Sequence, residues 1–415
     1  MEKKSHRMAG ERLAMKRIAL YFGDVFWSTL PYGGLSIYES LSKDYEVIPI
    51  FQKNDIRLHK TWRGNEKFYF DKERFLNLPY EEVDNIPEFI KKINPDLYLC
   101  SIQMQFKPNH SGKNRQIKNM GVKVGMWDCG GSDSLWCDSK QTGWDYLFIK
   151  GQKWKEAITN IGEIKKKVTV CVPPISSQDP SKIFVTGTPE YDDLNTCKTS
   201  RKDFCKKYNL DVDRPIIAYL PANPGPDNSW VYPSTRITAR QALDDIGKNL
   251  RILENEGYQV CMKSHPNDYI TTEIGEPYSA IHPRANRGGY KTTRYDEFGF
   301  HTIEAQDGYE LYKICDFAVT NYSHAGQEIP LTGKRCLSYR MKECPEWQFL
   351  ETLNESAYLD VMGGFELREA IMSANKTALE IPKEELEILI DDYYCTATGT
   401  AHENISKVIK NKILW

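Results

Sequence analysis

The sequence has little that would place the protein in a membrane, on a nucleic acid or in a secretory pathway. No apolar run approaches the ~20 residues that a membrane-spanning helix requires. The polar start of the chain lacks the apolar centre of a secretory signal, and we expect residues 1–15 to be disordered and outside the fold. Because 55 Lys and Arg residues are balanced by 57 Asp and Glu residues, the net charge of -2 gives no electrostatic support to nucleic-acid binding. These absences predict a cytoplasmic protein without a nucleic-acid partner.

The common metal, redox and dinucleotide motifs are also missing. The 11 cysteines are scattered with no C-x-x-C pair, and several fall inside apolar stretches where Cys acts as a small hydrophobe. The histidines show no metal-ligand spacing, and the D-V-D stretch at 211–213 precedes a predicted strand instead of following one. The glycine-rich loop after the first strand lacks the G-x-G-x-x-G spacing. We therefore expect reduced thiols, no metal site, no bound cofactor and a metal-independent reaction.

The chain carries instead a repeated alternation of strand and helix patterns, and its 415 residues are enough for two domains. In the first half, strands are predicted at 16–22, 45–51, 96–102, 122–127, 146–149, 168–172 and 183–186, and helices at 35–41, 81–93 and 113–120. In the second half, strands are predicted at 215–220, 258–263, 301–304, 317–320 and 335–339, and helices at 237–255, 308–314 and 324–331.

Two successive halves of this kind predict an α/β fold with two doubly wound, Rossmann-like domains that face each other across a cleft. The first domain is expected over residues 16–195 and the second over 203–385, with the boundary in the polar stretch 192–202. The helical segment over 386–415 is expected to cross back onto the first domain. A long polar connection at 267–298 is expected to cover a site or to contact a substrate.

The stretch 315–340 is the most informative part of the sequence. It reads as strand, polar turn, short helix, glycine and second parallel strand, which is a βαβ unit. Ligands in such sheets lie beyond the carboxyl ends of the strands, where a hydroxyl and the N–H groups of the next helix bind anions. Gln327 and Glu328, one turn along that helix, are predicted to reach a ribose. The predicted phosphate site itself is the polar turn formed by Asn321, Tyr322 and Ser323.

A second candidate is the sequence K-S-H-P-N at 263–267, which closes the predicted strand 258–263. Pro266 has no N–H group and suits a chain that leaves a sheet. A histidine at the carboxyl end of a strand can bind a phosphate oxygen or protonate a leaving phosphate. The alternative is a loop histidine satisfied by a backbone carbonyl. The neighbouring phosphate turn favours a functional role for His265, with Lys263 beside it.

Asp128 follows the strand 122–127 in the first half, and Gly130 and Gly131 allow a close backbone approach. A carboxylate at a strand end, opposite a phosphate site in the other domain, is placed to activate an acceptor hydroxyl as a general base. The alternative, equally supported, is that Asp128 caps the following turn. Weaker rivals for the base are Asp24, Asp133 and Asp138.

Three further positions are interpreted mainly in structural terms. The turn V-T-G-T-P-E-Y-D at 185–192 reads as the domain hinge, in which Gly187 and Thr188 also come close enough to touch a ligand phosphate. His324 directly follows the phosphate turn and either contacts the ligand or only begins a helix. Basic residues in the long connection are candidates for an anionic acceptor, although solvated loop charges are more common: Arg284, Arg287 and Lys291.

These residues together resemble two-domain nucleotide-sugar enzymes of the GT-B architecture. The resemblance is to CDP-glycerol glycerophosphotransferases and UDP-N-acetylglucosamine 2-epimerases, and it spans about residues 120–340 in the order of the family motifs. V-T-G-T-P-E-Y-D is similar to V-T-G-N-P-x-x-D, and K-S-H-P-N is similar to K-P-H-P and to the His-Pro motif of bacterial CMP-sugar transferases. T-N-Y-S-H-A-G-Q-E-I-P-L-T-G-K-R resembles T-D-Y-S-S of the transferases and S-G-G-x-Q-E-E-A-P-x-x-G-K-P of the epimerases.

The resemblance implies that the first domain lies on the acceptor side and the second binds the donor. It also implies that His265, Ser323 and Glu328 contact the phosphates and ribose of the donor. Two departures bear on the activity. The transferases have W-H-G-T with a catalytic histidine, where this chain has W-D-C-G-G, so Asp128 takes that place. The epimerase D-S-G-G is replaced by N-Y-S-H at 321–324.

We therefore expect a glycosyltransferase that moves a sugar, or a polyol phosphate, from a UDP-, CDP- or CMP-linked donor to a glycan or lipid-linked acceptor. Asp128 would deprotonate the acceptor, His265 with the 321–324 turn would stabilise the leaving phosphate, and Glu328 would hold the ribose. The resemblance alone implies a role in bacterial surface polysaccharide synthesis (capsule, teichoic acid or lipopolysaccharide), with peripheral contact at the inner membrane face. The alternatives are a nucleotide-sugar epimerase and a non-catalytic nucleotide-binding module.

Overall fold

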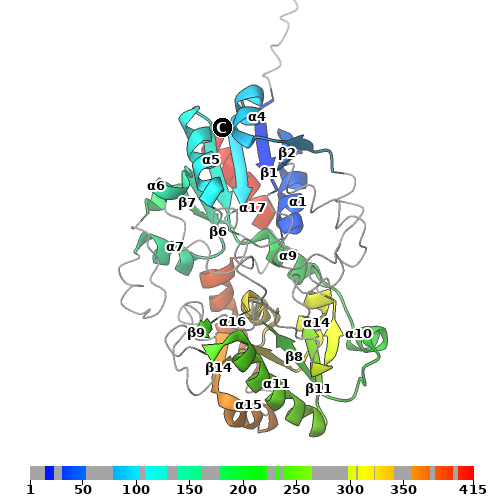
Figure 1. Ribbon diagram of the computed structural model, residues 1–415. Coiled ribbons are helices and arrows are strands. Elements are labelled where there is room, and N and C mark those ends of the chain that lie inside the picture. The colour runs from blue at the N-terminus through cyan, green and yellow to red at the C-terminus, as the bar shows by residue number, and fades with distance from the viewer. Residues whose placement is uncertain are drawn as a thin grey trace, which may run out of the picture.

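The computed structural model describes residues 15–22, 30–52, 78–101, 108–128, 139–160, 178–221, 230–232, 237–263, 298–304, 307–321, 323–340, 357–373, 379–395 and 401–415. Within these ranges the chain forms two large parallel sheets, one from each half, in the upper and lower parts of Figure 1. The predicted α/β class with two doubly wound halves is confirmed. The predicted strand 168–172 and the connection 267–297 lie outside the described residues.

The first sheet has seven parallel strands in the order β3-β2-β1-β4-β5-β6-β7. The strands are β1 (Arg17–Tyr21), β2 (Glu46–Gln52), β3 (Glu81–Val83), β4 (Leu97–Ser101), β5 (Lys123–Trp127), β6 (Tyr146–Ile149) and β7 (Ile183–Val185). The helices are α1 (Leu30–Leu41), α4 (Ile86–Ile93), α5 (Pro108–Asn119), α6 (Ser139–Thr142), α7 (Gln152–Thr159) and α9 (Pro189–Thr196), with a 3-10 turn η4 (Pro180–Lys182) before β7. The strand order reverses beside β1, as in doubly wound folds that bind ligands at this point.

Alternate side chains of the first sheet are buried on its two faces. Ala19 and Tyr21 of β1 pack in the core that includes residues of α4, α5 and α7. Ile18 and Leu20 pack on the opposite face with α1 and with the C-terminal helix α17 (Ala401–Val408). A strand covered on both faces has a nearly continuous apolar sequence, which is why runs such as R-I-A-L-Y predict buried parallel strands.

The second sheet has six parallel strands in the order β12-β11-β8-β13-β14-β15. The strands are β8 (Ile216–Leu220), β11 (Gln259–Lys263), β12 (His301–Ile303), β13 (Phe317–Thr320), β14 (Cys336–Arg340) and β15 (Tyr358–Met362). Helices α10 (Arg201–Tyr208) and α14 (Gly308–Ile314) cover one face, and α11 (Ala239–Asn255) and α15 (Gly363–Met372) cover the other. A separate antiparallel pair is formed by β9 (Trp230–Tyr232) and β10 (Ile237–Thr238).

The C-terminal segment links the two halves, as the sequence predicts. It consists of α16 (Lys383–Leu389), the π-helical η12 (Ile390–Tyr394), α17 and the π-helical η13 (Ile409–Ile413). Leu389 and Tyr394 are buried in the core of the second half, whereas Ile405 and Ile409 are buried in the core of the first. Figure 1 shows the segment passing from α16, at the junction of the halves, to α17 in the upper half.

Two predicted helices differ in the structure. The segment 81–93 is the short strand β3, which pairs with β2, followed by α4. Asn85 causes this division, because its side chain accepts a hydrogen bond from the Glu88 N–H group and begins the helix there. The segment 324–331 forms two 3-10 turns, η7 (His324–Gln327) and η8 (Ile329–Thr332), instead of one α-helix. Pro330 lacks an N–H group and its ring would clash with the carbonyl of Gly326 in an α-helix.

Among the helices of the described residues, none has the length and apolar character that crossing a membrane requires.

Candidate functional site

Four neighbouring strands of the first sheet lead into buried polar side chains at their carboxyl ends. The side chains have no exposed surface. They are Ser101 at the end of β4, Asp128 after β5, Lys150 after β6 and Thr188 in the loop after β7. Because the strands are parallel and adjacent, these residues lie along one edge of the sheet.

Two of these side chains have hydrogen-bonding capacity that the described part of the protein does not use. Ser101 Oγ and Thr188 Oγ1 are fully buried and form no hydrogen bond with any described residue. A buried polar atom without a partner costs free energy comparable to a lost hydrogen bond. Such atoms, grouped at the edge where α/β sheets bind ligands, indicate a binding site for a polar molecule.

Asp128 lies between β5 and β6. Its backbone N–H group donates to the carbonyl of Phe148 at 2.8 Å, and Lys150 follows Phe148 by two residues at the end of β6. The predicted base therefore lies at the strand end next to that of Lys150, a residue that the sequence analysis did not single out. Gly130, Gly131 and the alternative carboxylate Asp24 lie outside the described residues.

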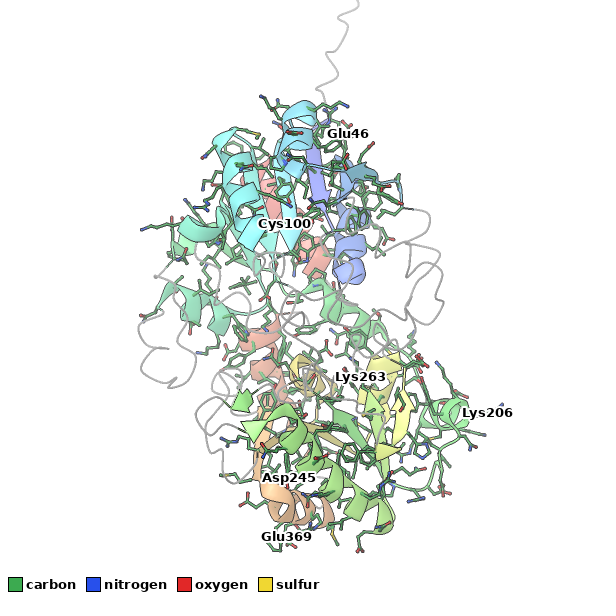
Figure 2. The ribbon with its side chains drawn as sticks, viewed as in Figure 1. Glu46, Cys100, Lys206, Asp245, Lys263 and Glu369 are labelled. Carbon is green, nitrogen blue, oxygen red and sulfur yellow. The ribbon has the colours of Figure 1, made fainter. Side chains whose placement is uncertain are left out.

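The carboxyl edge of the second sheet also carries polar and charged groups. Lys263 ends β11, Asn321 follows β13 and Arg340 ends β14. The Asn321 side-chain oxygen accepts a hydrogen bond from the Tyr219 hydroxyl at 3.2 Å, which fixes the amide at the strand end. Arg340 is only 4% exposed, and the sequence analysis did not single it out. Figure 2 shows Lys263 at the end of the lower half that faces the upper half.

The predicted phosphate turn is held by its own hydroxyl groups. The Ser323 N–H group donates to Thr320 Oγ1 at 3.1 Å, and the Ala325 N–H group donates to Ser323 Oγ at 3.3 Å. Ser323 thus caps the 3-10 turn η7, and its hydroxyl proton remains as a donor. Tyr322 and the side chain of His324 are outside the described residues.

Glu328 lies between η7 and η8, and the surrounding groups shift the pKa of its carboxyl group. Burial raises the pKa of its carboxyl group to about 7, against the lowering effects of Lys263, the hydroxyls of Tyr312 and Tyr309, and Lys150. The two lysines come from different halves of the molecule. Glu328 is therefore an acid that titrates near neutral pH between two ammonium groups.

Lys150 and Gln327 join the carboxyl edges of the two sheets. The Lys150 ammonium donates to Gln327 Oε1 at 3.1 Å and lies 3.9 Å from the ring centroid of Trp154. Gln327 is 1% exposed, and its amide nitrogen Nε2 forms no hydrogen bond with any described residue. Its backbone carbonyl accepts a hydrogen bond from the Tyr394 hydroxyl of the crossing segment at 2.7 Å. The only feature of the sequence that points to Lys150 is its position directly after the apolar strand Y-L-F-I.

The loop after β7 combines a sheet contact with the link to the C-terminal segment. Gly187 has φ +85°, a left-handed conformation that favours glycine, and its N–H group donates to the Ile149 carbonyl at 3.1 Å. Asp192 in α9 accepts hydrogen bonds from the Ala401 N–H group and from His402, whose Nδ1 lies 2.7 Å from the carboxylate. This contact raises the pKa of His402.

Several predicted site residues therefore lie together, and others cannot be located. Lys263, Gln327 and Glu328 share one electrostatic environment, with Asn321 and Ser323 in the adjoining turn. His265 lies outside the described residues, as do Arg284, Arg287 and Lys291. Within the described ranges, no group of three His, Cys, Asp or Glu side chains is arranged to hold a metal ion.

No protein-family model matches the chain, and no curated protein matches it in sequence. Solved structures are similar over nearly its full length. UDP-GlcNAc 2-epimerase from Neisseria meningitidis bound to UDP-GlcNAc has a TM-score of 0.55 and 12% identity, covering 96% of this chain and 100% of that one. The S. aureus MnaA–UDP structure has a TM-score of 0.56 and 13% identity, covering 95% and 96%. The wall teichoic acid polymerase TagF has a TM-score of 0.51 and 15% identity, covering 96% and 88%.

At these identities the likeness shows the fold. The chain has the GT-B arrangement of two Rossmann-like domains. The epimerase and glycerophosphotransferase families that the sequence resembles are both present among its structural neighbours.

Proposed function

We propose that the protein is a metal-independent transferase that moves a sugar, or a related polyol phosphate, from a nucleotide-activated donor to a hydroxyl acceptor. The observation that carries the proposal is the Lys150–Gln327 hydrogen bond, which joins the carboxyl edge of one Rossmann-like sheet to that of the other. Asp128 adjoins one side of this contact, and Glu328 and the Ser323 turn adjoin the other. No cofactor is assigned, because the nucleotide-activated donor is itself a substrate.

The proposed reaction uses groups from both halves of the chain. Asp128 accepts the proton of the acceptor hydroxyl, whose oxygen attacks the anomeric carbon of the donor sugar. The bond from that carbon to the phosphate oxygen breaks, and the electron pair leaves with the nucleotide phosphate. His265, the 321–324 turn and Lys263 stabilise the charge on the leaving phosphate, and Glu328 holds the ribose. For a polyol phosphate, the same hydroxyl attacks the distal phosphorus and a nucleoside monophosphate leaves.

The biological setting is proposed from the structural neighbours. TagF is a wall teichoic acid polymerase, one of whose structures was soaked with CDPG, and two other neighbours are structures with UDP or UDP-GlcNAc. These names support a UDP- or CDP-linked donor, a CMP-linked donor being the third candidate. They also support a glycan or lipid-linked acceptor in bacterial surface polysaccharide synthesis. A lipid-linked acceptor would bring the protein into peripheral contact with the inner face of the membrane.

A nucleotide release assay tests this proposal. Incubating the protein with UDP-, CDP- and CMP-linked donors and hydroxyl acceptors should release nucleotide only when donor and acceptor match. Asp128→Asn should lower kcat by roughly 10²- to 10⁴-fold, the usual contribution of a general base, without weakening nucleotide binding. Asp213→Asn, at an exposed loop position, is the control and should keep the wild-type rate. Wild-type turnover by Asp128→Asn would remove Asp128 from the mechanism.

A nucleotide-sugar 2-epimerase is the second candidate, favoured by the full-length likeness to UDP-GlcNAc 2-epimerases. Such an enzyme needs no separate acceptor. NMR of UDP-N-acetylglucosamine incubated with the protein distinguishes the two functions. An epimer formed without acceptor would replace the transferase proposal.

A further inference from the structure

Lys150 is a fully buried cation at the junction of the two sheets. It follows β6 of the first sheet, while its hydrogen-bond partner Gln327 belongs to the turn after β13 of the second. Burying an ammonium group costs several kcal/mol unless strong electrostatic contacts compensate. A lysine at this point therefore needs an explanation beyond packing, since an apolar side chain of the same length would fill the space at lower cost.

The neighbouring amide supplies an independent indication of a ligand. Gln327 uses Oε1 to accept from Lys150, and its backbone carbonyl is held by Tyr394, yet its buried Nε2 donates to no described residue. The same side chain thus presents an unused donor beside an ammonium group. The buried Thr188 Oγ1, in the loop hydrogen-bonded to Ile149 just before Lys150, is a further unpaired polar atom. An ammonium, an amide N–H and a hydroxyl are all suited to donate to phosphate oxygens.

The charge of a phosphate determines how it would compete with Gln327 for the Lys150 ammonium group. The ammonium group of Lys150 is attracted by the full negative charge of a phosphate oxygen, whereas the amide oxygen of Gln327 carries only a partial charge. A phosphate reaching this junction would therefore displace Gln327 Oε1 as the acceptor of the Lys150 proton. Lys263, from the second sheet, and Lys150 both lower the pKa of Glu328 electrostatically. Lys263 is therefore a second cation close to the same junction.

We propose that Lys150 is a donor-binding residue supplied by the first domain, which exchanges its hydrogen bond to Gln327 for the leaving phosphate of the nucleotide donor. This rests on the proposed function and deepens it, because it assigns one phosphate contact to the domain otherwise reserved for the acceptor. The same ammonium group then contacts Gln327 in the ligand-free protein and the donor phosphate in the complex. In the reaction, Lys150 stays protonated and stabilises the negative charge that the breaking bond leaves on the phosphate.

The test compares Lys150→Met with Lys153→Met. Methionine keeps the length of the side chain and removes its charge. Lys153 lies on the surface of α7, paired with Glu156 at 3.4 Å, so its replacement removes the same charge from the same region. UDP, CDP and CMP are titrated calorimetrically against wild type and both variants, with uridine and cytidine as phosphate-free controls.

Lys150→Met should weaken the binding of whichever nucleotide wild type binds by roughly 10- to 100-fold, the effect of losing one charge-assisted hydrogen bond. Nucleoside binding should be unchanged, and Lys153→Met should match wild type. The melting temperature of ligand-free Lys150→Met should equal or exceed that of wild type, because replacing a buried ion by an apolar side chain of similar length is often neutral or stabilising. A purely structural lysine would instead lower this temperature.

The outcomes separate the two proposals. Nucleotide binding by Lys150→Met within twofold of wild type overturns the role of Lys150 and leaves the proposed function intact. An equal loss of nucleotide and nucleoside binding, or a fall in the melting temperature of the ligand-free variant, also overturns it. If wild type binds none of UDP, CDP and CMP, both proposals fall together.

Discussion

Glu328 illustrates at the scale of a single residue how the fold changes the chemistry of a side chain. Burial outweighs the attraction of Lys263 and Lys150 and raises the pKa of the carboxyl group to about 7 from its ordinary 4.5. The folded protein therefore binds more protons at this position than the unfolded chain between these two pH values. It follows that the contribution of Glu328 to stability is complete below pH 4.5 and is lost as the pH rises through 7.

Glu328→Gln removes this pH dependence of the stability. The melting temperature of the variant minus that of wild type should be larger at pH 8 than at pH 5. The reason is that only the wild-type carboxyl group becomes charged in that range. Glu387→Gln, whose side chain is 69% exposed, is the control and should show a constant difference. Equal differences for Glu328→Gln at both pH values would contradict the assigned pKa.

His402 has a raised pKa for the opposite reason, since the nearby Asp192 carboxylate stabilises the imidazolium. Glu403 adds to the effect, and burial and Lys43 oppose it. The stabilisation is fully present below the ordinary pKa of about 6.5 and is lost as the pH rises through the folded value. His402→Gln should therefore reduce the free energy of unfolding more at pH 6 than at pH 8.5, measured by urea denaturation. A loss that grows with pH would refute the ion pair.

At the scale of one element, the turn η7 depends on a close approach of Gly326 to β13. A Cβ atom at this position would lie 2.9 Å from Thr320 Cγ2. Thr320 cannot shift easily, because its hydroxyl donates to the Leu220 carbonyl and accepts from the Ser323 N–H group. Because Gly326 has no Cβ atom, the turn η7 can pack against the end of β13.

Gly326→Ala should lower the free energy of unfolding by about 1–3 kcal/mol through overpacking, and should weaken nucleotide binding by displacing the Ser323 turn. Gly112→Ala in α5 is the matched control, because a Cβ atom there meets nothing within 4 Å. That substitution should leave stability unchanged or raise it. Chemical denaturation and nucleotide titration of both variants provide the comparison, and equal behaviour of the two would show that the close approach is unimportant.

The same element shows where sequence patterns suffice and where they do not. The strand 317–320 and the turn after it are predicted from an apolar run followed by polar residues, and the structure agrees. The helix predicted at 324–331 is wrong, because apolar periodicity does not register that Pro330 interrupts an α-helix. The position of Lys150 at the junction is missed for a different reason. It depends on which strand ends become neighbours, and a local pattern contains no such information.

At the scale of the whole molecule, the C-terminal segment ties the two domains together. The Tyr394 hydroxyl donates a hydrogen bond to the backbone carbonyl of Gln327 in the second half. The Asp192 carboxylate accepts hydrogen bonds from the N–H groups of Ala401 and His402 at the start of α17. α17 and η13 then bury Ile405, Ile409 and Ile413 in the first half. The helical tail and its return to the first domain are predicted from the sequence, whereas the contact with Gln327 is not.

A substitution at Ile409 tests how much the packing of the C-terminal segment stabilises the first domain. The side chain is fully buried, so Ile409→Ala should lower the free energy of unfolding by about 2–5 kcal/mol. Ile388→Ala, at a position 63% exposed on α16, should change it by less than about 0.5 kcal/mol. Urea denaturation of both variants measures the difference. Similar values would mean that the crossing segment does not support the first domain.

The central claim is that the carboxyl edges of the two sheets form one site for a nucleotide-activated donor. A crystal structure of the protein with UDP or CDP, whichever binds, tests it most directly. The account predicts a phosphate within hydrogen-bond distance, roughly 2.7–3.2 Å, of both the Ser323 turn and Lys150. A nucleotide bound away from these two groups, or held by one sheet with Lys150 still donating to Gln327, would contradict the claim.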